Sequence, residues 1–323
     1  MTQAPIALSC GEPAGIGPEI AARAWEALRD SCPFVWIGDP RHLPEGTPVE
    51  VVSAPADAIS LSARTLPVLH HPFAAPTTPG QPTPENAAGV ISAIERGVAL
   101  VQSGDCAAIC TAPIHKKALI DGAGFAYPGH TEFLAALAGV DRVVMMLASD
   151  QLRVVPATIH IALSEVPRHL TPDVLRATIR ITHDGLRARF GIAAPRIAVA
   201  GLNPHAGEGG AMGREELDWI APLIEEMRAE GLDISGPKPA DTMFHAAARA
   251  GYDAAIAMYH DQALIPIKTL DFDRGVNVTL GLPFVRTSPD HGTAFDIAGR
   301  GIANPTSLIE ALKLAQRMAQ GAA

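Results

Sequence analysis

The sequence predicts a two-lobed α/β/α protein, and three observations support this fold class. The chain has 323 residues, which is too many for one small core and suits two lobes. Hydrophobic residues make up 48% and charged residues 18%, the balance of a folded globular protein. Short apolar runs that read as strands alternate with segments of helical spacing. This alternation predicts a largely parallel sheet that is covered on both faces.

The expected elements follow one another in a regular order. The expected strands, each a short apolar run, are residues 6–8, 34–37, 107–110, 143–147, 197–200 and 254–258. The expected helices are residues 18–28, 86–101, 133–137, 172–190, 214–228 and 305–318. Segment 86–101 shows the helical pattern plainly, because Val90, Ile94, Val98 and Val101 recur every three or four residues. Ligands of such folds gather at the carboxyl ends of strands, so site residues are expected directly after the strands.

Composition excludes several classes of function. The net charge is −9 and no basic tract is present, so nucleic acid is not an expected partner. No segment offers about 18 uninterrupted apolar residues, so no membrane span is expected. The four cysteines, Cys10, Cys32, Cys106 and Cys110, form no CxxC pair and are expected to be buried thiols. A reduced, cytoplasmic setting is therefore expected.

Three histidines stand at or just past the ends of apolar runs: His160 in TIHI, His205 in NPHAGEGG and His260 in MYHDQ. Neutral imidazole is the commonest metal ligand and a common general base. A lone histidine is more often a structural residue whose hydrogen bonds are made within the protein. Three histidines in matching strand-end positions favour a metal site. No further cysteine or histidine completes a closed set of four ligands, so an open catalytic site is expected.

Two glycine-containing turns precede expected helices. Residues 11–19, GEPAGIGPE, lack the GxGxxG pattern and the Walker lysine. A turn that binds no ligand is therefore as consistent with these residues as a ligand site. In residues 127–132, YPGHTE, Thr131 is a candidate helix cap, with Glu132 favouring the positive helix end. The functional alternative places His130 and Thr131 at a helix N-terminus that favours an anionic substrate group.

A lysine, an amide and an arginine follow the third histidine. Lys268, Asn277 and Arg286 lie within a run of short apolar strands. Two cations and an amide are suited to hold a phosphate or a carboxylate. Solvated surface charge is the weaker interpretation, because Lys268 and Arg286 are embedded in the apolar segments 264–267 and 282–285.

Residues 290–305, DHGTAFDIAGRGIANP, resemble the adenosine-binding loop of the isocitrate and isopropylmalate dehydrogenases. Those enzymes oxidise a hydroxy acid with a nicotinamide cofactor and a divalent metal. The resemblance implies the same kind of fold, NAD or NADP as cofactor, and an active site in the interlobe cleft. The residues that would line the cofactor are His291, Gly292, Thr293, Ala294, Asp296 and Asn304.

The motifs GEPAGIGPE, TAPIHK, YPGHTEFLA, NPHAGEGG, PADTMF, YHDQALIPIK and GVNVTLGLPFVRTSPDHGTAFDIAG together resemble the 4-hydroxythreonine-4-phosphate dehydrogenase family of vitamin B6 (pyridoxine) biosynthesis. The resemblance implies one divalent metal held by His160, His205 and His260. It maps the substrate contacts onto His130, Thr131, Lys268, Asn277 and Arg286. No ligand position departs from the family pattern. The proline-rich loop 72–84 is expected to touch none of these motifs.

The same resemblance implies a homodimer whose active site lies near the subunit interface and takes residues from both chains. Residues 1–126 plus 291–323 are expected to form a cofactor-side lobe, and residues 127–290 a metal- and dimer-interface-side lobe. Three imidazoles suit zinc or cobalt by affinity and magnesium less well.

The implied reaction is the NAD(P)-dependent oxidation of 4-phosphooxy-L-threonine (4-hydroxy-L-threonine 4-phosphate) at C3. The metal would hold and polarise the hydroxyl oxygen, and Lys268 or Asp241 would relay its proton. The product, 2-amino-3-oxo-4-phosphooxybutanoate, would lose CO₂ and leave 3-amino-2-oxopropyl phosphate.

Other functions remain open at this point. A related dehydrogenase would act on phospho-threonate, phospho-erythronate or a cis-dihydrodiol. A metal-dependent lyase or hydrolase would use the same three histidines without NAD, and segment 290–305 argues against it. A non-catalytic small-molecule binding protein is the third alternative.

Overall fold

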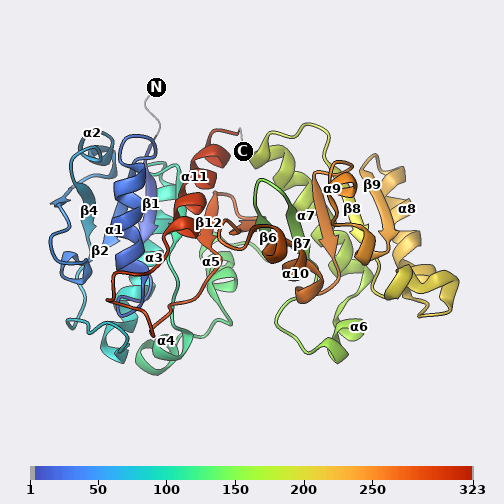
Figure 1. Ribbon diagram of the computed structural model, residues 1–323, viewed down its shortest axis with the longest axis horizontal. Helices are drawn as coiled ribbons and strands as arrows, with labels where there is room; N and C mark the ends of the chain where they lie inside the picture. Colours follow the sequence, from blue (N-terminus) through green and yellow to red (C-terminus); the bar gives the residue numbers. More distant parts are fainter. Residues whose placement is uncertain (1–3, 322–323) are drawn as a thin grey trace. The chain divides into compact units, whose positions relative to one another are not determined.

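The computed structural model describes residues 4–321 and confirms the α/β class (Figure 1). The chain divides into two compact units. Unit 1 holds residues 4–141 and 282–320, and unit 2 holds residues 142–281. Segments 127–141 and 282–290, which were expected in the second lobe, cluster with unit 1.

Unit 1 is built on parallel strands in the order β3-β4-β2-β1-β5-β12. The strands are β1 (Ile6–Ser9), β2 (Phe34–Gly38), β3 (Val49–Val51), β4 (Leu66–His70), β5 (Ala108–Thr111) and β12 (Arg286–Pro289). The helices are α1 (Gly17–Leu28), α2 (Ala58–Leu61), α3 (Ala87–Gln102), α4 (Lys116–Ala123), α5 (His130–Ala138) and α11 (Thr306–Ala319). Helices α1 and α11 pack together over one face, and α3 covers the other (Figure 1). Strands β1, β2 and β5 are therefore buried throughout and read as continuous apolar runs.

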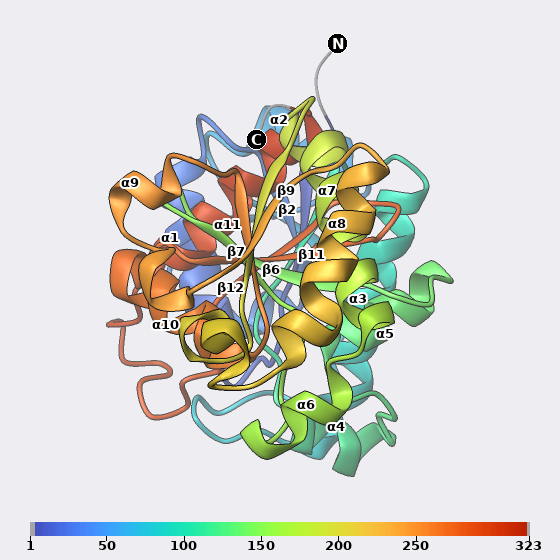
Figure 2. The ribbon, with the colours of Figure 1, turned by 90° about the vertical axis from the view of Figure 1, so that its right-hand side faces the viewer.

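Unit 2 has the strand order β11-β6-β7-β10-β8-β9. The strands are β6 (Val144–Ala148), β7 (Arg153–Pro156), β8 (Arg196–Ala200), β9 (Asp233–Lys238), β10 (Ala254–Ala257) and β11 (Val276–Leu280). The helices are α6 (Val166–His169), α7 (Pro172–Phe190), α8 (Ala221–Ala229), α9 (Ala246–Arg249) and α10 (His260–Asp271). Strand β6 pairs antiparallel with β11 and β7, while β7, β10, β8 and β9 are parallel. Figure 2 shows α7 and α8 on one side of these strands and α9 and α10 on the other.

Short helical turns complete both units. They are η1 (Pro40–His42), η2 (Pro55–Asp57), η3 (Pro84–Asn86), η4 (Leu163–Glu165), η5 (Pro204–Gly210), the π-turn η6 (Glu216–Ile220) and η7 (Ala240–Thr242). The π-turn η6 precedes α8, so the helix expected over 214–228 is not one regular α-helix.

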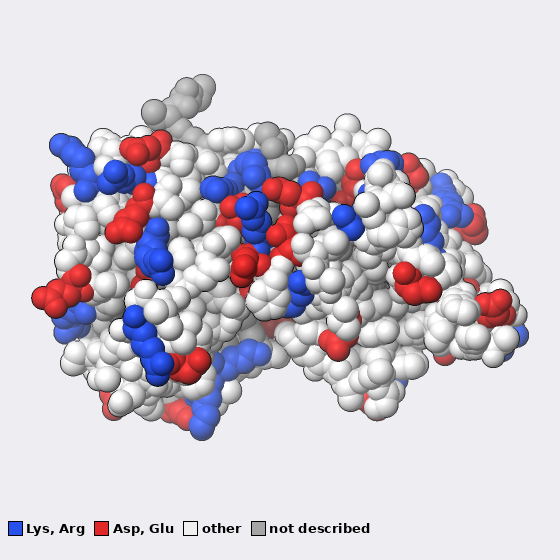
Figure 3. All heavy atoms as spheres, in the orientation of Figure 1, with Lys and Arg blue, Asp and Glu red and all other residues white. Residues whose placement is uncertain are grey.

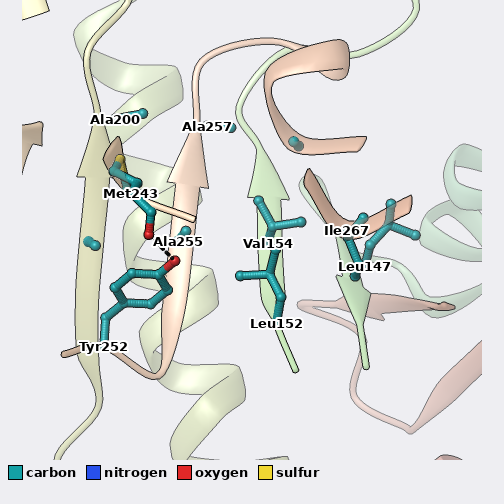
Figure 4. Close-up of a cluster of buried hydrophobic side chains, with 11 residues drawn as sticks. Leu147, Leu152, Val154, Ala200, Met243, Tyr252, Ala255, Ala257 and Ile267 are labelled. Carbon is teal, nitrogen blue, oxygen red and sulfur yellow. Dashed lines mark hydrogen bonds between the residues drawn. The ribbon is translucent and has the colours of Figure 1, made fainter. Parts of the chain in front are cut away.

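A buried cluster joins α10 to the strands of unit 2 (Figure 4). Ala263 and Ile267 of α10 pack on Val154, Ala255 and their neighbours, all nearly inaccessible to solvent. The Tyr252 hydroxyl donates to the carbonyl oxygen of Met243 at 3.0 Å, as the dashed line in Figure 4 shows. This bond ties the segment after η7 to the residues that precede β10.

The strands expected around Lys268 are wrong, because residues 260–271 form helix α10 with Pro266 inside it. Ala263 and Ile267 are spaced by four residues and point to the core, so packing of one helical face overrides the apolar run. Strands β11 and β12, around Asn277 and Arg286, are confirmed.

Three other features concern surface and chemistry. All four cysteines are buried free thiols, as predicted. Acidic and basic side chains are interspersed on the face seen in Figure 3. Within residues 4–321, no helix combines the length and apolar character that a membrane crossing requires.

Candidate active site

The three histidines follow the carboxyl ends of three neighbouring parallel strands. His160 comes after β7, His260 opens α10 directly after β10, and His205 lies in η5 after β8. The sheet order β7-β10-β8 makes these strands adjacent. The sequence prediction that each histidine lies at or after a strand end is therefore confirmed, and all three lie in unit 2.

Two hydrogen bonds align the segments that carry His160 and His260. The Ala157 N–H donates to the Ala257 carbonyl oxygen at 2.8 Å, and the Thr158 hydroxyl donates to the Met258 carbonyl oxygen at 2.7 Å. Each histidine follows its aligned partner by two residues, so the rings lie side by side with centroids 5.7 Å apart. Both rings line a pocket of about 250 Å³ together with Tyr259 and Asp261.

Gln262 links the His260 segment to the segment that carries His205. Its side-chain oxygen accepts from the Met258 N–H at 2.7 Å, and its amide nitrogen donates to the Gly201 carbonyl oxygen at 2.9 Å. Buried Glu216 then accepts from the Asn203 N–H at 2.8 Å. The ends of β10 and β8 are thus held together by one glutamine.

Left-handed backbone marks the predicted ligand segments. Among residues 4–321, the non-glycine residues with positive φ are His160, His205, Ala206, Glu208 and Ala294. The left-handed conformation costs a non-glycine residue roughly 1–2 kcal/mol. Such strain concentrates at functional sites, where the surrounding structure holds it in place. All five residues fall in the histidine segments or in segment 290–305.

The donor chemistry of the three histidines fits a divalent metal. Glu208 accepts from Nδ1 of His205 at 2.9 Å, and Asp261 lies 2.7 Å from Nδ1 of His260. A carboxylate on one ring nitrogen fixes the tautomer and leaves Nε2 as the ligating atom. Within the described chain, no three His, Cys, Asp or Glu side chains are close enough to hold an ion as they stand.

A second set of candidate residues lies in unit 1, at the ends of β5 and β12. Arg286 is 2% exposed, and its guanidinium donates to the Thr111 hydroxyl through Nε at 3.2 Å and Nη2 at 2.7 Å. Burial lowers the pKa of Arg286 to about 10. A buried guanidinium bonded to a neutral hydroxyl is suited to a charge-assisted bond with an incoming anion.

His130 lies beside this guanidinium, at the first residue of helix α5. Its Nε2 is buried without a partner among the described residues. Thr131 is the second residue of the helix and makes no cap, and Gly129 at the cap position has no side chain to offer one. The capping prediction for Thr131 is therefore wrong, whereas the predicted place of His130 and Thr131 at a helix N-terminus is confirmed. That end of a helix attracts anions.

Burial lowers the pKa of His130 well below its usual range, and the positive charges of Arg286 and Lys116 lower it further. His130 is therefore neutral at physiological pH and able to offer one donor. Lys116, the first residue of α4, extends toward the same place: a Cβ at Gly129 would lie 3.5 Å from its Nζ. Two cations thus act on the ring of His130, which stands at a helix N-terminus.

The depressed pKa of His130 predicts how stability depends on pH. The unfolded state, in which a histidine has a pKa of about 6.5, binds the proton first, so stability is present above that pH and declines as the pH falls below it. Urea unfolding at several pH values should show a shallower decline for His130→Gln than for the parent. Burial also lowers the pKa of His42 and His71, so some decline remains in the variant. Equal slopes would contradict the prediction.

Segment 290–305 is fastened to the first glycine turn. The Ile16 N–H donates to the Thr293 carbonyl oxygen at 3.0 Å, and Glu19 accepts from the Ala303 N–H at 3.0 Å. A Cβ at Gly15 would lie 2.9 Å from the Thr293 carbonyl oxygen, so only glycine permits this approach. The GEPAGIGPE turn therefore supports the predicted cofactor segment.

The predicted cofactor residues differ in how they are held. Nε2 of His291 is buried and has no partner within residues 4–321, as a ligand-binding donor would be. Asn304 instead accepts from the Thr306 N–H and hydroxyl, at 3.0 and 2.7 Å, at the start of α11. Gly292, Thr293, Ala294 and Asp296 lie in the same irregular segment.

The remaining predicted residues belong to unit 2. Asn277 lies on β11, and its side-chain oxygen is buried with no partner among the residues described. Nζ of Lys268, on α10, lies 5.2 Å from the centroid of the Phe272 ring. Asp241, in η7, lines a second pocket of about 390 Å³ with Tyr259 and Asp261.

Known proteins match this chain along its length. The family model described as "Pyridoxal phosphate biosynthetic protein PdxA" matches residues 30–315. A curated relative, the 4-hydroxythreonine-4-phosphate dehydrogenase of Ruegeria sp. (strain TM1040), is 74% identical over 322 residues, or 99% of each chain. The chain belongs to the PdxA family.

Solved structures agree with this family. The crystal structure of 4-hydroxythreonine-4-phosphate dehydrogenase from Klebsiella pneumoniae is 39% identical, has a TM-score of 0.89, and is matched over 98% of this chain and 100% of its own. A terephthalate 1,2-cis-dihydrodiol dehydrogenase from Burkholderia xenovorans LB400 is 28% identical, with a TM-score of 0.66 and 97% of each chain covered. The family thus has structural relatives that differ in the substrates they are named for.

The structure adds three features that the sequence interpretation missed. Two of them are Lys116 and Gln262, which lie in the motifs TAPIHK and YHDQALIPIK. Their place in these motifs is the sequence signal that could have identified them. Loop 72–84 was expected to touch no motif, and this is wrong. The Gly80 N–H donates to the Ala14 carbonyl oxygen at 2.7 Å, a contact between residues far apart in sequence.

Proposed function

We propose that this protein oxidises 4-phosphooxy-L-threonine at C3, with NAD or NADP and one divalent metal per site, in vitamin B6 biosynthesis. The product would lose CO₂ and leave 3-amino-2-oxopropyl phosphate. The full-length match to relatives named 4-hydroxythreonine-4-phosphate dehydrogenase carries this proposal. The buried guanidinium of Arg286 and the amino group of Lys116, whose charges both act on His130, support a phosphorylated substrate.

His160, His205 and His260 would hold the metal, which when bound would polarise the substrate hydroxyl as a Lewis acid. Zinc or cobalt fits three imidazoles better than magnesium. The chain's own contribution is orientation. Glu208 and Asp261 fix the tautomers, while Thr158 and Gln262 align the loops that bear the rings. Preorganised ligands of this kind avoid reorganisation during the reaction.

Arg286, His130 and Thr131 would receive the substrate phosphate or carboxylate in unit 1. Arg286 offers a planar fork of donors, and neutral His130 offers one N–H without adding charge. Lys268 and Asn277 would contribute from unit 2. The buried unpartnered oxygen of Asn277 is suited to accept from the substrate ammonium or hydroxyl.

The proton released from the hydroxyl would pass to Lys268 or to Asp241, both polar groups of unit 2. Asp241 lines a pocket with Asp261, the neighbour of His260. The segment from His291 to Asn304 would hold the nicotinamide cofactor, which when bound would accept the hydride from C3. We further propose a cytoplasmic homodimer in which both chains contribute to each site.

A panel of substrates tests this proposal against its nearest alternatives. Metal-reconstituted protein is mixed with NAD⁺ or NADP⁺ and, in turn, 4-phosphooxy-L-threonine, phospho-threonate, phospho-erythronate and a cis-dihydrodiol. We expect the highest kcat/KM for the phosphorylated threonine. A higher value for another compound would assign the protein to that substrate. Turnover without nicotinamide, together with no NAD⁺ binding by calorimetry, would indicate a lyase or hydrolase.

The neighbouring lysines of α4 provide a matched test of the anion site. Lys116 extends toward Gly129, whereas Lys117 pairs with Asp121 at 2.7 Å. Lys116→Ala should raise KM for the phosphorylated substrate about tenfold, the effect of losing one charge-assisted bond. Lys117→Ala should leave KM unchanged. Steady-state kinetics on both variants checks this. Equal substrate KM values for the two variants would show that Lys116 does not contact the substrate.

A further inference from the structure

The proline-rich loop 72–84 contains a tight turn, residues 78–81, that belongs to none of the motifs of the site. Thr78 and Gln81 form an isolated antiparallel bridge, and the Gln81 N–H donates to the Thr78 carbonyl oxygen at 3.0 Å. Gly80 has a φ of +82°, so the turn needs a residue that tolerates left-handed backbone. The turn is thus a rigid feature inside a loop that composition alone would describe as exposed and irregular.

The turn contacts both segments that form the predicted cofactor side of unit 1. On one side, the Gly80 N–H donates to the carbonyl oxygen of Ala14, in the GEPAGIGPE turn, at 2.7 Å. On the other side, a Cβ at Gly80 would lie 2.9 Å from the Phe295 carbonyl oxygen. The ring of Pro79 packs on Gly299, where a Cβ would lie 2.6 Å away.

Through these contacts, each of three segments touches the other two. The GEPAGIGPE turn binds segment 290–305 directly through Ile16 and Thr293. The 78–81 turn packs against both of these segments. Between Thr293 and Gly299, segment 290–305 includes Ala294, which has strained left-handed backbone with a φ of +44°. Strained backbone persists only where its surroundings over-determine it. The 78–81 turn contacts Phe295 and Gly299 on the C-terminal side of Ala294, while the GEPAGIGPE turn holds Thr293 on its N-terminal side.

We propose that the 78–81 turn is a positioning element that holds segment 290–305 in the conformation that binds NAD(P), with Gly80 as its critical residue. This inference rests on the proposed role of that segment in the proposed function. Loosening a preorganised loop lowers affinity, because ordering the loop then opposes binding. The turn touches no reacting atom, so its loss should weaken cofactor binding and leave the chemical step intact.

Gly80→Ala tests the proposal, and Gly46→Ala is its matched control. Gly46 has nearly the same φ, +83°, but nothing lies within 4 Å of a Cβ placed there. Both variants therefore carry the same backbone strain, and only Gly80→Ala pushes against Phe295. We expect Gly80→Ala to raise Kd and KM for NAD⁺ on the order of tenfold, with kcat and the substrate KM near the parent values. Gly46→Ala should match the parent in all four.

Hydrogen exchange of the 290–305 amides provides a readout that needs neither cofactor nor turnover. Exchange there should be faster in Gly80→Ala than in Gly46→Ala. If Gly80→Ala does not fold, Pro79→Ala replaces it, with a smaller effect in the same direction. Equal NAD⁺ affinity and equal exchange in a variant and its control would overturn the proposal. A parent that binds NAD⁺ but turns over none of the substrates would instead overturn the proposed function, and the exchange comparison would still decide this inference.

Discussion

His260→Ala is expected to lower kcat/KM by more than about 100-fold and to reduce the bound metal. Loss of a group that merely orients a metal ligand costs about 10- to 100-fold, so loss of a ligand itself should cost more. His260 begins α10, and the buried face of that helix, Ala263 and Ile267, is untouched by the change. Thermal unfolding should therefore remain close to that of the parent, while metal analysis and steady-state kinetics should both change.

His169→Ala is the matched control for this prediction. His169 is also an exposed histidine of unit 2, but it ends α6, where its Nε2 lies 3.8 Å from a carboxylate oxygen of Glu165. We expect it to keep full activity and metal content. Parental metal content and turnover in His260→Ala would show that the three-histidine assignment is mistaken.

Arg286→Lys should raise KM for the phosphorylated substrate about 10- to 100-fold. Lysine keeps the positive charge but loses the planar fork, and a hydrogen bond to a charged group contributes about 1.5–3 kcal/mol. The long lysine side chain also fills most of the space that the arginine occupies, which limits the cavity left at a residue that is 2% exposed. The substrate KM should therefore rise far more than the KM for NAD⁺.

Arg64→Lys, a change at an exposed arginine of unit 1, is the control for a general effect of arginine replacement. It should leave both KM values unchanged. An equal rise in the two KM values of Arg286→Lys would indicate a disturbed fold in place of a lost substrate contact. Circular dichroism and thermal unfolding on the same samples separate these outcomes.

Elements with local signals were predictable from the sequence. Helix α7 has the bounds expected, because Thr171 caps it by accepting from the Val174 N–H, Pro172 opens it, and Gly191 ends it with a φ of +68°. Helix α10 has no such signal, since Pro266 and an apolar run suggest strands. Its helical state comes from packing on the strands of unit 2, which no local pattern reveals. Strand β3 is short and exposed, and it was missed.

The site divides in the same way. The histidines could be predicted, because parallel strands bring their carboxyl ends to one edge of a sheet. The left-handed backbone at His160 and His205 could not, since only a small fraction of histidines adopt it. The contact of Gly80 with Ala14 joins segments about 66 residues apart, and only the fold reveals it.

Metal-dependent turnover is the most direct test of the account. Protein is stripped of metal with a chelator, and reduction of NAD⁺ by 4-phosphooxy-L-threonine is followed by absorbance before and after titration with zinc or cobalt. We expect no turnover in the stripped protein, recovery that saturates near one ion per chain, and CO₂ released in step with NADH. Full turnover in the stripped protein, or none after reconstitution with either metal, would contradict it.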